Sequence, residues 1–180
     1  MLKNIAATAI IASAIAKPAE DQFTELPNGD STISMTTDSY SGYINATDTK
    51  QLHYVFVESK NDPANSPVLI WFNGGPGCSS MLGFMQENGP INYDDDTNEI
   101  STNDQSWNQN ANVLYIESPA GVGFSIAGTE ADKIHNDMST SKDAVDALYQ
   151  WYVKFPEYVD NKLYISGESY GGIYVPYLAW

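Results

Sequence analysis

The sequence has few basic residues. Eight lysines and arginines stand against 23 aspartates and glutamates, which gives a formal net charge of −15. Such a chain repels the phosphate backbone of nucleic acids and the surfaces of anionic membranes. We therefore expect no nucleic-acid partner and no stable association with membranes. The acidity is consistent with simple solubility, or with an acidic compartment in which partial protonation would relieve the self-repulsion.

Long hydrophobic runs are also missing, except at the amino terminus. There, residues 1–16 contain a basic residue, Lys3, an apolar run from Ile5 to Ile15, and a small-x-small motif that ends at Ala16. These are the parts of a secretory signal peptide, and the run is shorter than the roughly 20 apolar residues that span a bilayer. We expect residues 1–16 to be removed, and the mature chain to follow the secretory pathway to the cell exterior or to a lysosome or vacuole.

Cysteine and histidine are scarce. Cys78 is the only cysteine, and His53 and His135 are the only histidines. We expect both histidines to be structural, His53 within a strand and His135 in a turn, and we expect neither a metal site nor a cofactor. An unpaired cysteine in a secreted chain suggests that its partner is missing.

About 164 residues remain after the signal peptide, enough for one domain at most. Residues 17–39 are a polar lead-in without periodicity, and residues 40–180 hold the periodic segments of the domain. Alternating apolar and polar residues predict a β-hairpin with strands at 40–46 and 51–58. Asn45 begins an Asn-Ala-Thr glycosylation sequon near the tip of this hairpin.

Continuous apolar runs follow the hairpin. Residues 68–72 and 113–116 each predict a buried strand, because a strand covered on both faces needs no polar alternation. Apolar residues at helical spacing predict a helix that begins at Asn136 and ends before Pro156.

A Gly-x-Ser-x-Gly motif spans Gly167 to Gly171, between an apolar segment and a helical pattern. Strand, sharp turn and helix in this order are typical of the nucleophile elbow of α/β-hydrolases, which holds a serine in a strained conformation with its hydroxyl exposed. The glycines follow from this geometry, because side chains there would clash where strand and helix cross. Ser169 is therefore the candidate nucleophile.

A second glycine-rich loop, at residues 73–80, follows directly after the predicted strand 68–72. Three glycines around a proline make a loop whose backbone N–H groups can approach a ligand closely, as an oxyanion hole requires. A phosphate-binding loop is the rival interpretation, but no Gly-Lys-Ser/Thr follows and no dinucleotide-binding glycine pattern is completed.

Three blocks of sequence resemble the serine carboxypeptidases of the α/β-hydrolase fold. The blocks are WFNGGPGCSS at 71–80, ESPAGVGFS at 117–125 and ISGESYGGIYVP at 165–176, and the similarity runs from about Tyr40 to the end of the chain. The resemblance implies an α/β fold: the N-terminal part of the central mixed sheet with flanking helices, interrupted just after the nucleophile elbow. It also implies a disulfide between Cys78 and a cysteine farther downstream.

The resemblance further implies a role for several residues in cleaving the C-terminal residue from peptides and proteins. Ser169 would be acylated, and the N–H groups of Gly75 and Tyr170 would form the oxyanion hole. A set of residues around the two loops would bind the terminal carboxylate of the substrate: Trp71, Asn73, Gly74, Glu87 and Glu168. Two adjacent glutamates suit this task, because a proton shared between them in mild acid can be donated to the substrate.

A serine hydrolase of this fold carries its acid and its histidine after the nucleophile. Only eleven residues follow Ser169, and they include no aspartate and no histidine. We therefore expect this chain to be the N-terminal part of a longer enzyme, and to be inactive and poorly soluble alone. Two alternatives stay open: an acyltransferase on the same scaffold, or a short product without catalytic activity.

Overall fold

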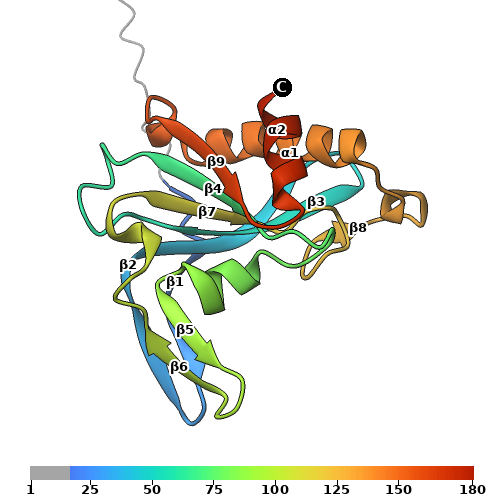
Figure 1. Cartoon of the computed structure of the whole chain (residues 1–180). Helices are drawn as coiled ribbons and strands as arrows, with labels where there is room; N and C mark the ends of the chain where they lie inside the picture. Colours follow the sequence, from blue (N-terminus) through green and yellow to red (C-terminus); the bar gives the residue numbers. More distant parts are fainter. Residues whose placement is uncertain (1–16) are drawn as a thin grey trace, which may run out of the picture.

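The computed structural model describes residues 17–180, so the predicted signal peptide lies outside the described residues. Within residues 17–180, seven strands form one mixed sheet, with β8 paired to β3 at its side and the others in the order β1-β2-β3-β7-β4-β9 (Figure 1). The strands are β1 (Gln22–Asn28), β2 (Ser31–Asn45), β3 (Lys50–Val57), β4 (Val68–Phe72), β7 (Asn112–Ile116), β8 (Ile126–Ala127) and β9 (Leu163–Gly167). β1, β2, β3 and β7 are antiparallel neighbours, whereas β7, β4 and β9 run parallel.

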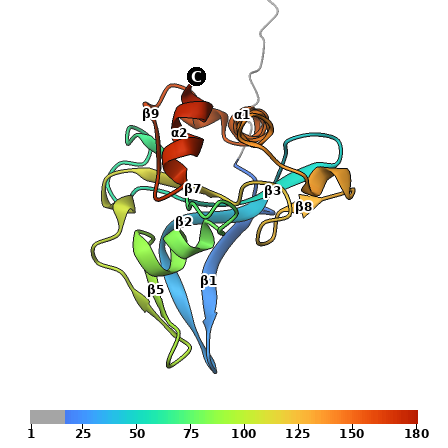
Figure 2. The same cartoon turned by 45° about the vertical axis from the view of Figure 1, so that its right-hand side comes forward.

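Each face of the sheet is covered differently. Helices α1 (Asp137–Lys154) and α2 (Gly171–Ala179) lie on one face, and the π-helical turn η1 (Gly83–Glu87) lies on the other with the hairpin of β5 (Ile91–Asp94) and β6 (Glu99–Thr102) (Figures 1 and 2). Three short 3₁₀ turns complete the described structure: η2 (Trp107–Gln109), η3 (Ala131–Lys133) and η4 (Pro156–Tyr158).

The predicted buried strands are confirmed. All five residues of β7 are buried, as are four of the five residues of β4. Both strands separate two apolar clusters, one beneath α1 and α2 and one beneath η1 and the β5–β6 hairpin. A strand between two such clusters needs apolar side chains on both faces, which is why its sequence shows no alternation.

Helix α1 begins and ends where the sequence predicts. The Asn136 side chain accepts a hydrogen bond from the Ser139 N–H at 2.9 Å, and the Ser139 hydroxyl accepts from the Asn136 N–H, so Asn136 caps the helix in a capping box. Phe155 ends the helix before Pro156. Near this end, Trp151 and Phe155 are buried against Phe56, with ring centroids 4.9 and 5.1 Å from its ring.

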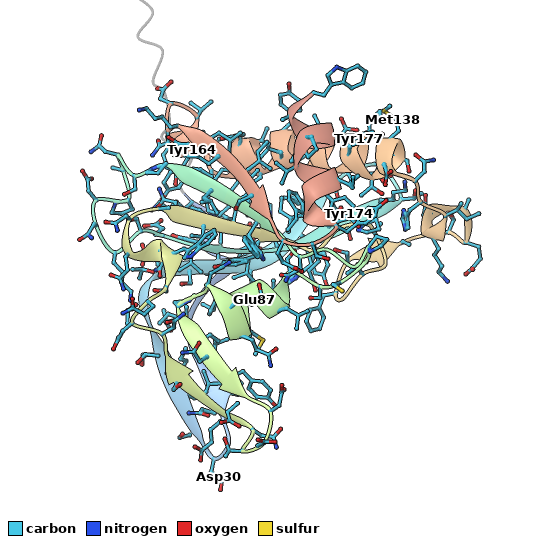
Figure 3. The ribbon with its side chains drawn as sticks, viewed as in Figure 1. Asp30, Glu87, Met138, Tyr164, Tyr174 and Tyr177 are labelled. Atoms are coloured by element: carbon cyan, nitrogen blue, oxygen red, sulfur yellow. The ribbon has the colours of Figure 1, made fainter. Side chains whose placement is uncertain are left out.

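The polar lead-in, residues 17–39, contains strands, although its sequence has no periodicity that would predict them. Residues 22–28 form β1 and residues 31–39 form the first part of β2, so that β2 is 15 residues long. The two strands form a hairpin that extends away from the helices, with Asp30 at its tip (Figure 3). Most of its side chains are exposed or half-buried, and the shallow burial explains why no clear apolar stripe marks these strands.

Strand β9 lies at the edge of the sheet in the described part of the chain. Its Leu163 and Tyr164 are 38% and 53% exposed, and Tyr164 projects from this edge in Figure 3. Exposed apolar edges of this kind are prone to pair with other chains. Across residues 17–180, no helix is long and apolar enough to cross a membrane, and no group of three or more metal-ligating side chains is present.

Candidate active site

Ser169 lies in the turn between β9 and α2. Its φ angle is +54°, a left-handed value that is uncommon for any residue except glycine. A side chain at Gly167 would place its Cβ only 2.6 Å from the carbonyl oxygen of Phe72, so the strand can pass β4 this closely only with glycine at this position. Ser169 is exposed to solvent.

The glycine-rich loop packs directly against this turn. A Cβ on Gly74 would lie 2.4 Å from the backbone nitrogen of Tyr170 and 2.7 Å from the carbonyl oxygen of Glu168. In the part of the chain that the structure describes, the N–H groups of Gly75 and Tyr170 donate to no protein atom. Free N–H donors beside an exposed hydroxyl are what an oxyanion hole requires.

Asn73 joins the glycine-rich loop to both predicted glutamates. Its side-chain N–H₂ donates to the Glu87 carboxylate at 3.0 Å and lies 3.5 Å from Glu168 Oε1. Its side-chain oxygen accepts from the Trp71 indole at 2.8 Å and from the Gly83 N–H at 2.9 Å. Asn73 is 1% exposed, so these bonds fix its orientation completely.

The two glutamates reach this site from opposite sides. Glu168 precedes the candidate nucleophile, and its Oε1 accepts from the Gly74 N–H at 3.2 Å. Glu87 ends η1, below the sheet in Figure 3. Both are exposed, so a ligand from solvent can reach them. The structure therefore brings together Trp71, Asn73, Gly74, Glu87 and Glu168, which are distant in sequence.

Neutral tyrosines surround the two loops. Burial raises the pKa of Tyr115, and the negative charge of Glu87 raises it further. The pKa of Tyr170 is raised by its 2.9 Å hydrogen bond to Asp137, and to a lesser degree by burial. Tyr174 of α2 accepts a hydrogen bond from the Gly77 N–H at 3.3 Å, and Figure 3 shows this tyrosine on the same side of the sheet as the elbow. These phenols therefore supply hydrogen bonds and add no charge.

Neither histidine joins the candidate nucleophile. His53 lies within β3, buried and hydrogen-bonded to Ser41 and Glu117. His135 precedes α1 and contacts the Ala120 carbonyl at 2.9 Å. Within residues 17–180 neither imidazole hydrogen-bonds to Ser169.

Two further predicted positions lie outside the cluster. Cys78 is exposed in the glycine-rich loop. Asn45 is exposed at the end of β2, where its side-chain oxygen accepts from the Gln51 amide at 2.9 Å.

Sequence reasoning placed Ser79 and Ser80 in the glycine-rich loop and Glu117 in the block at 117–125, but it assigned none of them a role. The Ser80 hydroxyl accepts from the Asn73 N–H and donates to the Ile116 carbonyl, and the Ser79 hydroxyl donates to Glu117. The available signal was Glu117 itself, an acidic residue directly after a fully apolar strand. A carboxylate in that position needs hydrogen-bond donors from elsewhere in the fold.

An exposed serine hydroxyl beside free N–H donors can form a covalent acyl intermediate when a base removes its proton. The side-chain N–H₂ of Asn73, between two solvent-exposed glutamates, can donate a hydrogen bond to a small carboxylate. Together the two features suit a substrate that carries a carbonyl close to a carboxylate.

Comparisons with known proteins find relatives of this chain. The mouse lysosomal protective protein is 54% identical over 142 residues, which cover 78% of this chain and 29% of that protein. Serine carboxypeptidase-like 20 of Arabidopsis thaliana is 41% identical over 169 residues, 90% of this chain and 34% of that protein. This chain therefore spans about a third of the length of the curated relatives it matches.

A solved structure shows the same fold. A prohormone-processing carboxypeptidase of Saccharomyces cerevisiae superposes with a TM-score of 0.69 at 30% identity, over 79% of this chain and 33% of that one. The predicted α/β-hydrolase-like fold is thus confirmed, with a mixed sheet and flanking helices. The sequence profile of the serine carboxypeptidases matches residues 27–180, and the chain belongs to the serine carboxypeptidase family.

Proposed function

We propose that this chain supplies the nucleophile and the carboxylate-binding site of a serine carboxypeptidase that removes C-terminal residues from peptides and proteins. One observation carries the proposal. The exposed Ser169, at φ +54°, adjoins the Gly74 backbone, and Glu168 hydrogen-bonds to that same backbone. A reacting carbonyl at Ser169 would therefore lie one residue away from a carboxylate at the Asn73 site.

In the proposed reaction, the Ser169 oxygen attacks the carbonyl carbon of the last peptide bond. The N–H groups of Gly75 and Tyr170 stabilise the oxyanion that forms, and the amino acid beyond the bond leaves with a proton. Water then hydrolyses the acyl-enzyme. A protein that carries this chain needs a base for Ser169, and we place it in the portion that the relatives possess beyond the region of similarity.

The carboxylate-binding part of the proposal rests on Asn73, Glu87 and Glu168, with Trp71 and Gly74 as supports. The side-chain N–H₂ of Asn73 would donate a hydrogen bond to the terminal carboxylate, and Glu87 and Glu168 flank that amide. We propose passage through the secretory pathway to the exterior or to a lysosome or vacuole, and glycosylation at Asn45.

We also propose that Cys78 pairs with a cysteine outside this chain. Its exposure in the glycine-rich loop leaves the thiol accessible to such a partner. Mass spectrometry of the non-reduced, digested full-length protein would detect the cross-linked peptide. A free thiol at Cys78 in the purified protein would contradict this pairing.

The test of the function uses the full-length protein that contains this chain. Ser169→Ala should abolish release of the C-terminal residue from an N-blocked peptide, whereas Ser166→Ala, in the preceding strand, should retain it. The same peptide with an amidated C-terminus should be a poor substrate of the wild type. Cleavage by the Ser169→Ala variant at the wild-type rate would exclude the proposed nucleophile.

An added alcohol separates the peptidase from the acyltransferase alternative. A peptidase releases mainly free acid, whereas an acyltransferase passes the acyl group to the alcohol and forms an ester. Ester as the dominant product at modest alcohol concentration would favour the acyltransferase and would leave the role of Ser169 unchanged.

A further inference from the structure

Glu117 is a fully buried carboxylate at the end of β7, with 0% of its surface exposed. Three groups from three different segments donate hydrogen bonds to it. They are the His53 ring at 2.9 Å from β3, the Phe124 N–H at 2.8 Å from the loop after β7, and the Ser79 hydroxyl from the glycine-rich loop. A buried acid with three donors is well satisfied, and it connects all three segments.

The carboxylate stays ionised in this position. Burial by itself would raise the pKa of Glu117, but the hydrogen bonds from His53, Ser79 and Phe124 together lower it below its ordinary value. The surroundings are closely fitted, because a Cβ on Gly123 would lie only 1.8 Å from Glu117 Oε1. Ser79 therefore donates to a fixed negative charge, and hydrogen bonds to charged groups are stronger than neutral ones.

Ser79 lies in the loop whose N–H groups face the candidate nucleophile. The end of this loop is joined to β7 at two successive residues, since Ser79 bonds to Glu117 and Ser80 donates to the Ile116 carbonyl at 2.7 Å. At the other end of the loop, the Asn73 N–H donates to the Ser80 hydroxyl at 3.2 Å. The position of Gly75 between these points is therefore set by contacts that end at Glu117 and Ile116.

The same network has the order of a catalytic triad. The Ser41 hydroxyl lies 2.9 Å from His53 Nε2, and His53 Nδ1 lies 2.9 Å from Glu117. Ser41, however, is within β2, and its own N–H donates to the Asp21 carbonyl at 2.7 Å. Its backbone N–H is therefore not free to stabilise an oxyanion, which argues against a second nucleophile at Ser41.

We propose that Glu117 is a positioning residue for catalysis at Ser169: through Ser79 it holds the glycine-rich loop in the geometry that forms the oxyanion hole, and His53 keeps it in place. This inference rests on the proposed function of Ser169. According to this proposal, the buried pair His53 and Glu117 affects the rate at which Ser169 is acylated, in addition to the stability of the fold.

Glu117 and His53 differ in their titratable neighbours. His53 is the only titratable group among the groups that shift the pKa of Glu117. His53 itself also lines an open cleft together with the titratable residues Glu20, Asp21, Glu25, Tyr43 and Tyr93. Loss of the His53 hydrogen bond removes a group that lowers the pKa of Glu117, so Glu117 then takes up its proton at higher pH.

The experiment measures the rate at which a phosphonofluoridate labels Ser169 in the full-length protein. Glu117→Gln and Ser79→Ala should each slow labelling by about tenfold, a fraction of the 10²- to 10³-fold loss for removal of an oxyanion donor. The KM for an N-blocked peptide should stay within about twofold, because Asn73, Glu87 and Glu168 are unchanged. In His53→Phe, the fall of the labelling rate at acidic pH should begin at a higher pH than in the wild type.

Glu58→Gln is the matched control. Glu58 is also buried, at 4% exposure, but it pairs with Lys17 away from the glycine-rich loop. This variant should lower thermal stability and leave the labelling rate unchanged. If Glu117→Gln and Ser79→Ala label at the wild-type rate, the positioning role is wrong while the function of Ser169 stands. If the wild type is not labelled at Ser169, both proposals fail.

Discussion

Backbone atoms build one side of the candidate site, and side chains build the other. On the nucleophile side, defined as Gly74, Gly75, Ser169 and Tyr170, two loops approach so closely that a single added carbon would overlap the opposite chain. On the carboxylate side, defined as Asn73, Glu87 and Glu168, the contacts are hydrogen bonds of 3.0 to 3.5 Å between side chains. The first side has no room for adjustment, whereas on the second side the exposed side chains of Glu87 and Glu168 can adjust by rotation.

This difference predicts two kinds of response to substitution. Changes on the nucleophile side should act through geometry and should affect the chemical step. Changes on the carboxylate side should act through binding or through satisfaction of buried groups, and should be graded. The four predictions that follow test this contrast in the full-length protein, from the largest effect to the smallest.

Gly74→Ala should have the largest effect. Its Cβ would lie 2.4 Å from the Tyr170 nitrogen, so the two loops must separate and the oxyanion donors move apart. We expect kcat for peptide cleavage to fall by about 10²- to 10³-fold, as for loss of one donor. Steady-state kinetics measure this, and circular dichroism verifies that the variant is folded.

Gly172→Ala is the matched control for that change. No atom lies within 4 Å of the position its Cβ would take, and Gly172 is within α2. This variant should keep wild-type kcat and gain up to about 1 kcal/mol of stability from the better helix propensity of alanine. If Gly74→Ala and Gly172→Ala had the same kcat, the close packing of Gly74 against the turn at Ser169 would not matter for catalysis.

Asn73→Ala should act first on stability. It leaves the Trp71 indole and the Gly83 N–H without their acceptor, and each unsatisfied buried donor costs about 1–3 kcal/mol. Urea unfolding should show a loss of this order in the free energy of unfolding, and KM should rise as well. Asn92→Ala, at an exposed position of β5, should change stability by less than about 0.5 kcal/mol. If Asn73→Ala also lowered the free energy of unfolding by less than about 0.5 kcal/mol, the hydrogen bonds of Asn73 would not be important for stability.

Glu87→Gln and Glu168→Gln should act on binding. Both residues are exposed, so an amide of the same size fits without loss of packing. We expect KM to rise by about tenfold with kcat changed less, which corresponds to roughly 1.4 kcal/mol of binding.

The exposed Glu99→Gln of β6 provides the comparison for these two variants and should match the wild type in kcat and KM. An unaltered KM in both Glu87→Gln and Glu168→Gln would remove these residues from the proposed binding site.

Asn136→Ala should have the smallest effect, and only on stability. It removes the capping box of α1, which is typically worth about 1 kcal/mol. Thermal unfolding should show a small decrease in Tm with unchanged kinetics, and Gln150→Ala on the exposed face of α1 should show neither effect. A change in kcat would mean that α1 contributes to the site through Asp137 and Tyr170.

Local sequence patterns predicted most of the elements around the site. The boundaries of β4 agree with the apolar run at 68–72, and the start of α1 agrees with Asn136, since burial on both faces and end capping leave signals within a few residues. The strands in residues 22–39 escaped prediction, because a hairpin with one shallow contact face has no strong apolar period.

The sequence by itself determined the nucleophile turn. Gly-Glu-Ser-Tyr-Gly between a strand and a helix is a motif of five neighbouring residues that predicts the turn without knowledge of the fold, although the nearest atom to a Cβ on Gly167 belongs to Phe72 of β4. Resemblance to known blocks identified Asn73, Glu87 and Glu168 as partners, although they are up to 95 residues apart. Their hydrogen bonds depend on how β4, η1 and β9 pack, and only the tertiary structure gives those distances.

Only the tertiary structure identified Glu117. A glutamate after an apolar strand carries no pattern that names its partners, and its donors come from residues 79, 124 and 53 on three separate segments. The physical reason is general. A strand, a turn motif and a helix that follow one another leave a pattern in neighbouring residues, whereas the hydrogen bonds of a buried charge depend on groups that the fold brings together.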